Sequence, residues 1–117
     1  MQDYKKLIVW SKAHELTINV YKKTKVFPKE EIYALTSQMR RATASIAINI
    51  VEGCGRRTKQ DKAHFMQMAF ASAQEVEYLL FLSTELEYLN AETYKVLEVE
   101  IIVIKSMLNS LIKKIKE

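Results

Sequence analysis

Apolar residues recur at helical spacing along most of this chain of 117 residues. Between residues 5 and 25 they lie four, three and four positions apart, which places them on one face of a helix. These residues are Val9, Ala13, Leu16 and Val20. Phe27-Pro28 should end this helix, because the residue before a proline is kept out of the α-helical region. The pattern therefore predicts a first helix from about Lys5 to Lys25.

A second helix is predicted from about Lys29 to Glu52. Pro28 suits its first turn, where two glutamates also favour the positive end of the helix dipole. Its apolar stripe consists of Ile32, Leu35, Met39, Thr43, Ile46 and Ile50. We expect Gly53 to end this helix, because glycine adopts the left-handed conformation of a helix terminus without steric cost.

Two further helices are predicted in the second half of the chain. The third should open after Gly55, with Thr58 as its N-cap and Asp61 three residues later. Its predicted stripe is Phe65, Met68, Ala69, Ser72, Val76, Leu79, Ser83 and Leu86. Asn90 should cap the fourth helix, whose apolar positions alternate spacings of three and four in a heptad pattern. They are Tyr94, Leu97, Ile101, Ile104, Leu108, Leu111 and Ile115.

The connections between these predicted helices are only a few residues long, so successive helices should lie antiparallel. A chain with 49% hydrophobic and 27% charged residues has a globular balance, and its length suits one domain. Two glycines and one proline are too few turn residues for a fold with many strands. We therefore predict an all-α protein, a single up-down-up-down four-helix bundle over residues 1–117.

Two of the helices carry more apolar residues than one core seam needs. The fourth has a second stripe that includes Val96, Val99 and Val103, and the second has Ile48 in an otherwise polar outer row. A small monomeric bundle does not normally expose such patches, which favours a subunit interface at these four residues. The alternative is a wide buried stripe in a thick bundle.

The predicted topology brings both chain ends and the connection between the second and third helices to one end of the bundle. The net charge is +4, but residues 1–62 carry +7 and residues 63–117 carry −3. Nine basic residues gather at this end, and we call them the basic pole. They are Lys5, Lys6, Arg56, Arg57, Lys59, Lys62, Lys113, Lys114 and Lys116. Such a pole favours nucleic acid, because lysine and arginine neutralise phosphates and release counterions.

The alternative for the basic pole is ordinary solvated charge. Lysines at helix C-termini complement the helix dipole and need no ligand, which explains Lys113, Lys114 and Lys116. It does not explain Lys59 and Lys62, which lie at the unfavourable N-terminal end of the third helix. The opposite end of the bundle mixes lysines with glutamates and is close to neutral.

The sequence argues against a catalytic or metal site. A di-iron bundle needs two Glu-x-x-His motifs, whereas this chain has one approximation, Asp61-x-x-His64. No Cys/His cluster has zinc spacing, and Cys54 has no histidine nearby in sequence to activate it. We expect no metal, no cofactor and no enzymatic activity, and we expect structural hydrogen bonds from Asn49 and Glu52.

The chain shows no sign of a membrane or secretory destination. No apolar run approaches the length of a membrane span, and the apolar stretch near the N-terminus is too short for a signal peptide. A single cysteine fits a reducing compartment. We therefore expect a cytoplasmic protein without a membrane partner.

Four segments together resemble a known family. They are LIVWSKAHEL, YKKTKVFPKEEIYALTSQMRRA, SIAINIVEGCGRR and FMQMAFASAQEVEYLL. In combination they resemble the four-helix-bundle proteins encoded within the intervening sequences of some bacterial large-subunit ribosomal RNA genes, often labelled as ribosomal proteins. The family usually has glycine at Ala34, proline at Ala47, serine at Ile48 and alanine at Val51. Loss of the proline predicts a straighter second helix, and Ile48 adds apolar surface outside the core stripe.

The resemblance implies a homopentameric ring and an association with ribosomal RNA. A related bundle, the accessory variability protein of diversity-generating retroelements, is a basic pentamer that binds nucleic acid and reverse transcriptase. By that analogy, phosphate contacts fall to Arg40, Arg41, Arg56, Arg57, Lys59 and Lys62, to which the basic pole adds Lys5, Lys6, Lys113 and Lys114. Because Arg40 and Arg41 lie mid-helix, away from the pole, a place in the subunit interface is the alternative for them.

The leading hypothesis is a non-catalytic, homo-oligomeric bundle that binds structured RNA, or nucleic acid generally, through basic surface. One alternative is a protein–protein interaction scaffold that uses the apolar faces of the second and fourth helices. Another is an enzyme whose dispersed site lies at the subunit junctions.

Overall fold

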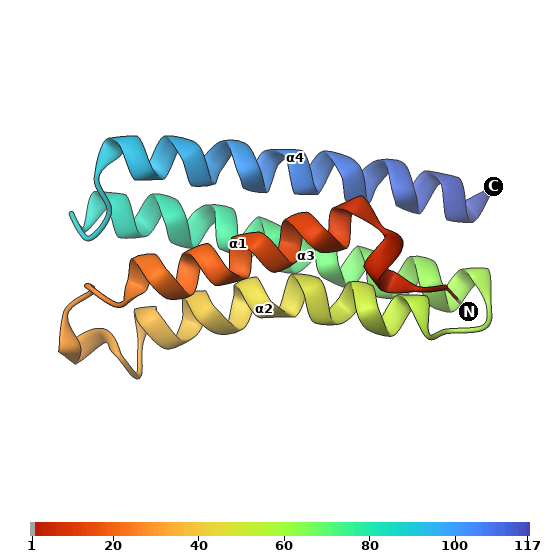
Figure 1. Cartoon of the computed structure of the whole chain (residues 1–117), viewed down its shortest axis with the longest axis horizontal. Helices are drawn as coiled ribbons and strands as arrows, with labels where there is room; N and C mark the ends of the chain where they lie inside the picture. Colours follow the sequence, from red (N-terminus) through yellow and green to blue (C-terminus); the bar gives the residue numbers. More distant parts are fainter. Residues whose placement is uncertain (1) are drawn as a thin grey trace.

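The computed structural model describes residues 2–117, which form an antiparallel four-helix bundle measuring 44 × 24 × 20 Å (Figure 1). The four long helices are α1 (Ile8–Thr24), α2 (Leu35–Cys54), α3 (Lys59–Glu85) and α4 (Ala91–Lys116). Two short 3-10 helices, η1 (Tyr4–Lys6) and η2 (Lys29–Glu31), precede α1 and α2. The all-α fold and the order of its helices confirm the prediction.

Each helix packs on its two neighbours around a square. Helix α2 lies against α1 and α3, and α4 lies against α3 and α1, so α2 and α4 occupy diagonal corners. The predicted core stripes of the first and fourth helices are confirmed, because Val9, Ala13, Leu16 and Val20 are buried, as are most of the heptad positions of α4. The most extensive helix–helix contact is between α2 and α3, which a short connection over residues 55–58 joins.

The start of the second helix differs from the prediction. The chain forms η2 and a turn before α2 begins at Leu35, because Ala34 has a non-helical backbone (φ −123°, ψ −106°). Ile32 was expected in the core stripe, yet it is 51% exposed, since the helical phase does not extend back to it. The Glu31 carboxylate accepts hydrogen bonds from the Leu35 amide at 3.4 Å and the Tyr88 hydroxyl at 2.9 Å. This side chain thereby fixes the entry to α2 against the α3–α4 connection.

Gly53 does not end the second helix, contrary to prediction. It lies inside α2, and neither glycine has a positive φ. A Cβ atom at Gly53 would lie 2.9 Å from Met66 Cε and 3.2 Å from Phe65 Cβ, both on α3. The glycine therefore serves the close approach of α2 to α3, and Gly55 is the cap residue, with an ordinary right-handed backbone.

The buried stripe of α3 was predicted only in part. Met68 and Leu86 are exposed, and Phe65 is only half-buried. The fully buried positions instead follow a heptad spacing of three and four, through Met66, Ala69, Ala73, Val76, Leu80 and Ser83. Helix α3 has apolar residues on several sides, so its sequence supports more than one stripe, and packing between α2 and α4 selects this one.

The predicted caps of the last two helices are confirmed. The Thr58 hydroxyl accepts a hydrogen bond from the Asp61 amide at 3.0 Å, and the Asn90 side chain accepts one from the Thr93 amide at 2.8 Å. Each cap satisfies an amide that the first turn of a helix otherwise leaves without a partner. Both short connections are thereby fixed where the chain reverses direction.

Candidate nucleic-acid interface

The basic pole forms at the end of the bundle where both termini and the α2–α3 connection meet (Figure 1). Three separate stretches contribute to it: residues 5–6 in η1, residues 56–62 around the start of α3, and residues 113–116 in the last turn of α4. Lys62 is half-buried, and the other eight cations are exposed. The antiparallel topology therefore gathers at one end basic residues that are far apart in the sequence.

Few acidic groups compensate these cations. The Asp3 carboxylate accepts a hydrogen bond from the Lys5 backbone amide at 3.0 Å and so caps η1. Arg56 lies 3.8 Å from Glu52 in a half-exposed ion pair, with its guanidinium carbon 4.4 Å from the centre of the Phe65 ring. Within residues 2–117, the other eight cations of the pole form no ion pair. Their charge is therefore available to an anionic partner.

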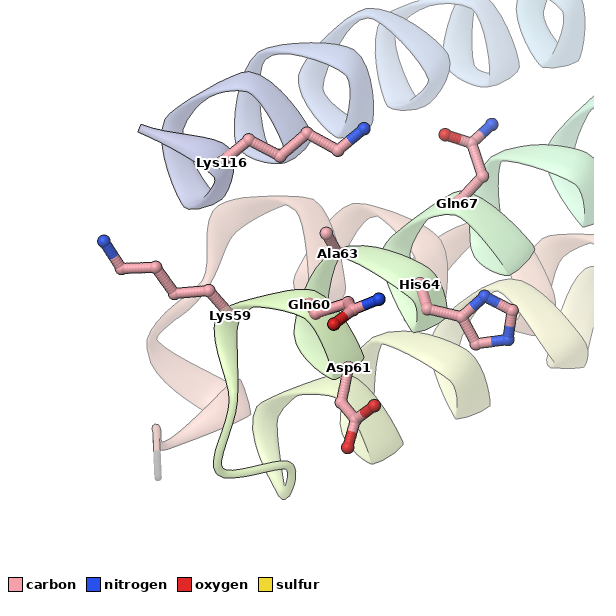
Figure 2. A pocket seen from close by; sticks show the side chains of 7 residues that line it. All are labelled: Lys59, Gln60, Asp61, Ala63, His64, Gln67 and Lys116. Atoms are coloured by element: carbon pink, nitrogen blue, oxygen red, sulfur yellow. The ribbon is translucent and has the colours of Figure 1, made fainter.

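A hollow of about 580 Å³ lies within this surface, between the start of α3 and the end of α4 (Figure 2). Its lining residues are Lys59, Gln60, Asp61, Ala63, His64, Gln67 and Lys116. Lys116 comes from the last turn of α4, whereas the others come from the first turns of α3 (Figure 2). The lysine and amide side chains of this depression can donate several hydrogen bonds to phosphate oxygens, whereas the Asp61 carboxylate, which also lines it, cannot. Gln60 and Gln67 were missed from the sequence, because their place in the hollow depends on where α4 ends.

The other two predicted nucleic-acid ligands, Arg40 and Arg41, do not join the basic pole. Arg40 Nε donates a hydrogen bond to Thr24 Oγ1 at 2.9 Å, and its guanidinium lies 4.8 Å from the centre of the Tyr21 ring. These contacts tie α2 to the end of α1, at the opposite end of the bundle. Arg41 is exposed on the outer side of α2. The two adjacent arginines thus have different surroundings.

The four predicted interface residues are exposed. Ile48 is 54% exposed on α2, whereas Ile46 and Ile50 on either side of it are fully buried, so it points away from the core. On α4, Val96 and Val99 are each 60% exposed and Val103 is 37% exposed. Because α2 and α4 occupy diagonal corners, these two apolar faces point in different directions.

The polar residues near the end of α2 make structural contacts. Asn49 is buried and donates hydrogen bonds to Ser45 O at 2.9 Å and Ser45 Oγ at 3.1 Å. Ser45 Oγ lies 3.0 Å from Ser72 Oγ, which extends this network to α3. Glu52 pairs with Arg56 rather than with a neighbouring helix. The structural hydrogen bonds predicted for Asn49 are thereby confirmed, whereas Glu52 makes an ion pair at 3.8 Å in place of the predicted hydrogen bond.

Cys54 has the surroundings of an unreactive thiol. Its side chain is buried, and burial raises its pKa, which outweighs the opposing effect of the nearby Lys62. A thiol reacts as its thiolate, so a raised pKa lowers its reactivity.

Residues 2–117 hold no group of three or more His, Cys, Asp or Glu side chains placed to bind a metal ion. In the same residues, no helix combines the length and the hydropathy that a bilayer span requires.

This chain is similar to a known protein family and to a solved crystal structure. Residues 5–110 match the model of the 23S rRNA-intervening sequence protein family. The fold is similar to the crystal structure of a protein with unknown function from the S23 ribosomal protein family from Bacteroides thetaiotaomicron, with a TM-score of 0.83 and 25% sequence identity. That similarity covers 91% of this chain and 96% of the other. No curated protein matches this chain. The family resemblance read from the four sequence segments is confirmed, while the relation to the retroelement protein stays a prediction.

Proposed function

Because the chain belongs to the 23S rRNA-intervening sequence protein family, we propose that it is a non-catalytic helical bundle that binds structured RNA through its basic pole and assembles with copies of itself. The observation that carries the proposal is the gathering of nine cations from three parts of the chain, eight of them without an ion pair in residues 2–117. The matched family's description names 23S rRNA, and the similar crystal structure is named for a ribosomal protein family.

Phosphate contact is the recognition mode that suits this surface. Lysine and arginine neutralise backbone phosphates, and the release of counterions gives affinity with little dependence on base sequence. Arg57 is exposed and free of ion pairs within the described chain, so its planar guanidinium can donate two hydrogen bonds to one phosphate. Glu52 and Phe65 contact the Arg56 guanidinium and orient it, and the Glu52 carboxylate offsets part of its positive charge. The pole is therefore suited to a folded RNA backbone rather than to individual bases.

The two apolar faces support the assembly part of the proposal. An interface with twofold symmetry uses the same patch on both subunits, whereas a head-to-tail interface joins two different patches and forms a ring when the rotation between subunits closes. The exposed faces of α2 and α4 are different patches on diagonal helices, which favours the head-to-tail arrangement. A homopentamer, which the family resemblance implies, is one such ring, and the single cysteine favours a cytoplasmic location for it. In a ring, several basic poles lie on one rim and contact one RNA together.

The RNA part can be tested by charge reversal at the two ends of the bundle. Fluorescence anisotropy would measure binding of a 23S rRNA fragment to the wild type and to the Arg57→Glu/Lys59→Glu variant. The matched control, Lys25→Glu/Lys29→Glu, makes the same change in charge at the opposite end. We expect the pole variant to lose about tenfold or more in affinity and the control to stay within about threefold, because phosphate contacts are local. Equal losses in both variants would contradict a site at the pole.

A second candidate function is an interaction scaffold for a different protein, which the exposed Ile48 and the α4 valines also fit. The oligomeric state separates the two. Self-assembly predicts a mass several times 13.6 kDa by light scattering at micromolar concentration. A monomeric mass would contradict self-assembly and favour the scaffold.

A further inference from the structure

Glu100 occupies an unusual position in the groove between α1 and α4. The groove is lined by Lys12, Glu15, Val99, Glu100 and Val103. Glu100 Oε2 is buried and has no hydrogen-bond partner within the described chain. Buried carboxylate oxygens are normally satisfied, because an unpaired buried charge is costly. This oxygen therefore indicates a missing partner.

The groups around Glu100 do not replace that partner. Burial and the neighbouring Glu15 carboxylate raise the pKa of Glu100, in that order of importance, whereas a hydrogen bond from the Asn19 side chain and the charge of Lys12 lower it. Neither Lys12 nor any other cation in residues 2–117 forms an ion pair with it. Between α4 and α3, Lys105 of α4 is already paired with Glu77 of α3 at 2.7 Å. Within residues 2–117, the subunit itself therefore supplies no cation to Glu100.

A cation that pairs with Glu100 from another molecule must lie within an apolar surface of that molecule, because the valine stripe of α4 borders the groove. This chain carries a surface of that kind on α2. Arg41, Ala44 and Ile48 are spaced by three and four residues, as are Val96, Val99 and Val103. Each set lies on one side of its helix and spans two turns, about 10 Å. Arg41 is exposed and forms no ion pair within residues 2–117.

We propose that, in the assembly, Arg41 of one subunit enters the α1–α4 groove of the next subunit and pairs with Glu100 there, while Ile48 packs on the valine stripe. This inference rests on the self-assembly proposed above. The partner is a second copy because one chain carries both surfaces, Arg41 with Ile48 on α2 and Glu100 with the valine stripe on α4. These diagonal helices do not contact each other within a subunit. Arginine suits the position, since its guanidinium can bind a carboxylate through two parallel hydrogen bonds.

Charge exchange across the interface tests this pairing. The mass of the wild type, Arg41→Glu, Glu100→Arg and the double variant would be measured by light scattering and sedimentation over a concentration series. We expect each single variant to raise the dissociation constant of the assembly about tenfold or more, because it places like charges together. The double variant should recover most of the lost affinity, because it restores an opposite-charge pair. Circular dichroism would check that every variant keeps its helices.

A matched control and the RNA assay separate this inference from the proposed function. Lys114→Glu makes the same change in charge as Arg41→Glu, but at the basic pole, and should leave the mass unchanged. If the wild type assembles and Arg41→Glu assembles equally well, the pairing is wrong while self-assembly stands, and the anisotropy assay described above tests RNA binding independently. A folded double variant that stays dissociated would also overturn the pairing. A monomeric wild type would overturn both the pairing and self-assembly.

Discussion

Gly53 and Gly55 are two residues apart, yet they have different roles. Gly53 sits where α2 and α3 come closest, and its missing side chain leaves room for Met66 and Phe65. Gly55 follows the helix with a right-handed backbone, and the nearest atom to an added Cβ would be Glu52 O at 3.4 Å. The sequence alone does not separate these roles, because a glycine near a helix end is typical of both a terminator and a close approach between helices.

Substitution of the two glycines by alanine distinguishes these roles. Gly53→Ala should lower the free energy of unfolding by about 1 kcal/mol, because overpacking against Phe65 Cβ exceeds the gain in helix propensity. Gly55→Ala is the matched control and should be neutral or slightly stabilising. Urea denaturation of both variants would measure the difference. A stabilised Gly53→Ala variant would show that α3 does not approach Gly53 closely.

At the scale of the elements, periodicity predicted the four helices, and local chemistry located the starts of α3 and α4. Thr58 and Asn90 were identified as caps because their side chains suit the first turn of a helix, and both make the expected hydrogen bond. The start of α2 could not be predicted, since Ile32 continues the apolar period while Ala34 leaves the helical region. The buried stripe of α3 was ambiguous for a related reason, because only its packing on α2 and α4 selects Met66 over Met68.

The two caps make a prediction about stability. Thr58→Ala and Asn90→Ala should each cost about 1 kcal/mol of unfolding free energy, because each leaves an amide of the first helical turn without its side-chain acceptor. Ser110→Ala on the exposed side of α4 is the control, and we expect a change within about 0.5 kcal/mol. Thermal and urea unfolding would measure all three. Equal effects in the three variants would contradict a specific role for the caps.

At the scale of the whole molecule, the basic pole could be predicted from the sequence because it requires only short connections and antiparallel helices. The groove at Glu100 could not be predicted, since it depends on how closely α1 and α4 pack. A glutamate beside two exposed valines looks like ordinary surface charge in the sequence. Only the structure shows that one of its oxygens is buried without a partner in the described chain.

Glu100 also makes the stability of the isolated subunit depend on pH. Its pKa is raised in the folded subunit above the ordinary 4.5, so the ionised carboxylate is disfavoured by folding. Its stabilising contribution is therefore fully present below the ordinary pKa and is lost as the pH rises through the raised value. In an Arg41→Glu background that keeps subunits apart, adding Glu100→Gln should raise the urea midpoint at pH 7 but not near pH 4.

The same substitution should act in the opposite direction on the assembled protein. With Arg41 present, Glu100→Gln removes the charge that Arg41 binds, so sedimentation should show weaker assembly at pH 7. If Glu100→Gln raises the urea midpoint of the isolated subunit and also weakens assembly, burial of Glu100 destabilises the subunit and its charge stabilises the interface. Unchanged stability of the subunit at pH 7 would contradict that cost.

The central claim is that the basic pole binds RNA through phosphates, and the salt dependence of binding tests it most directly. Binding of a 23S rRNA fragment would be measured between about 50 and 200 mM salt, a range over which a complex held by several phosphates weakens strongly. We predict a steep linear fall of log K with log salt. Arg56→Ala/Arg57→Ala should give a shallower slope, by about one for each phosphate that the variant no longer neutralises. Absence of binding at the lowest salt, or the same slope in the variant, would contradict the claim.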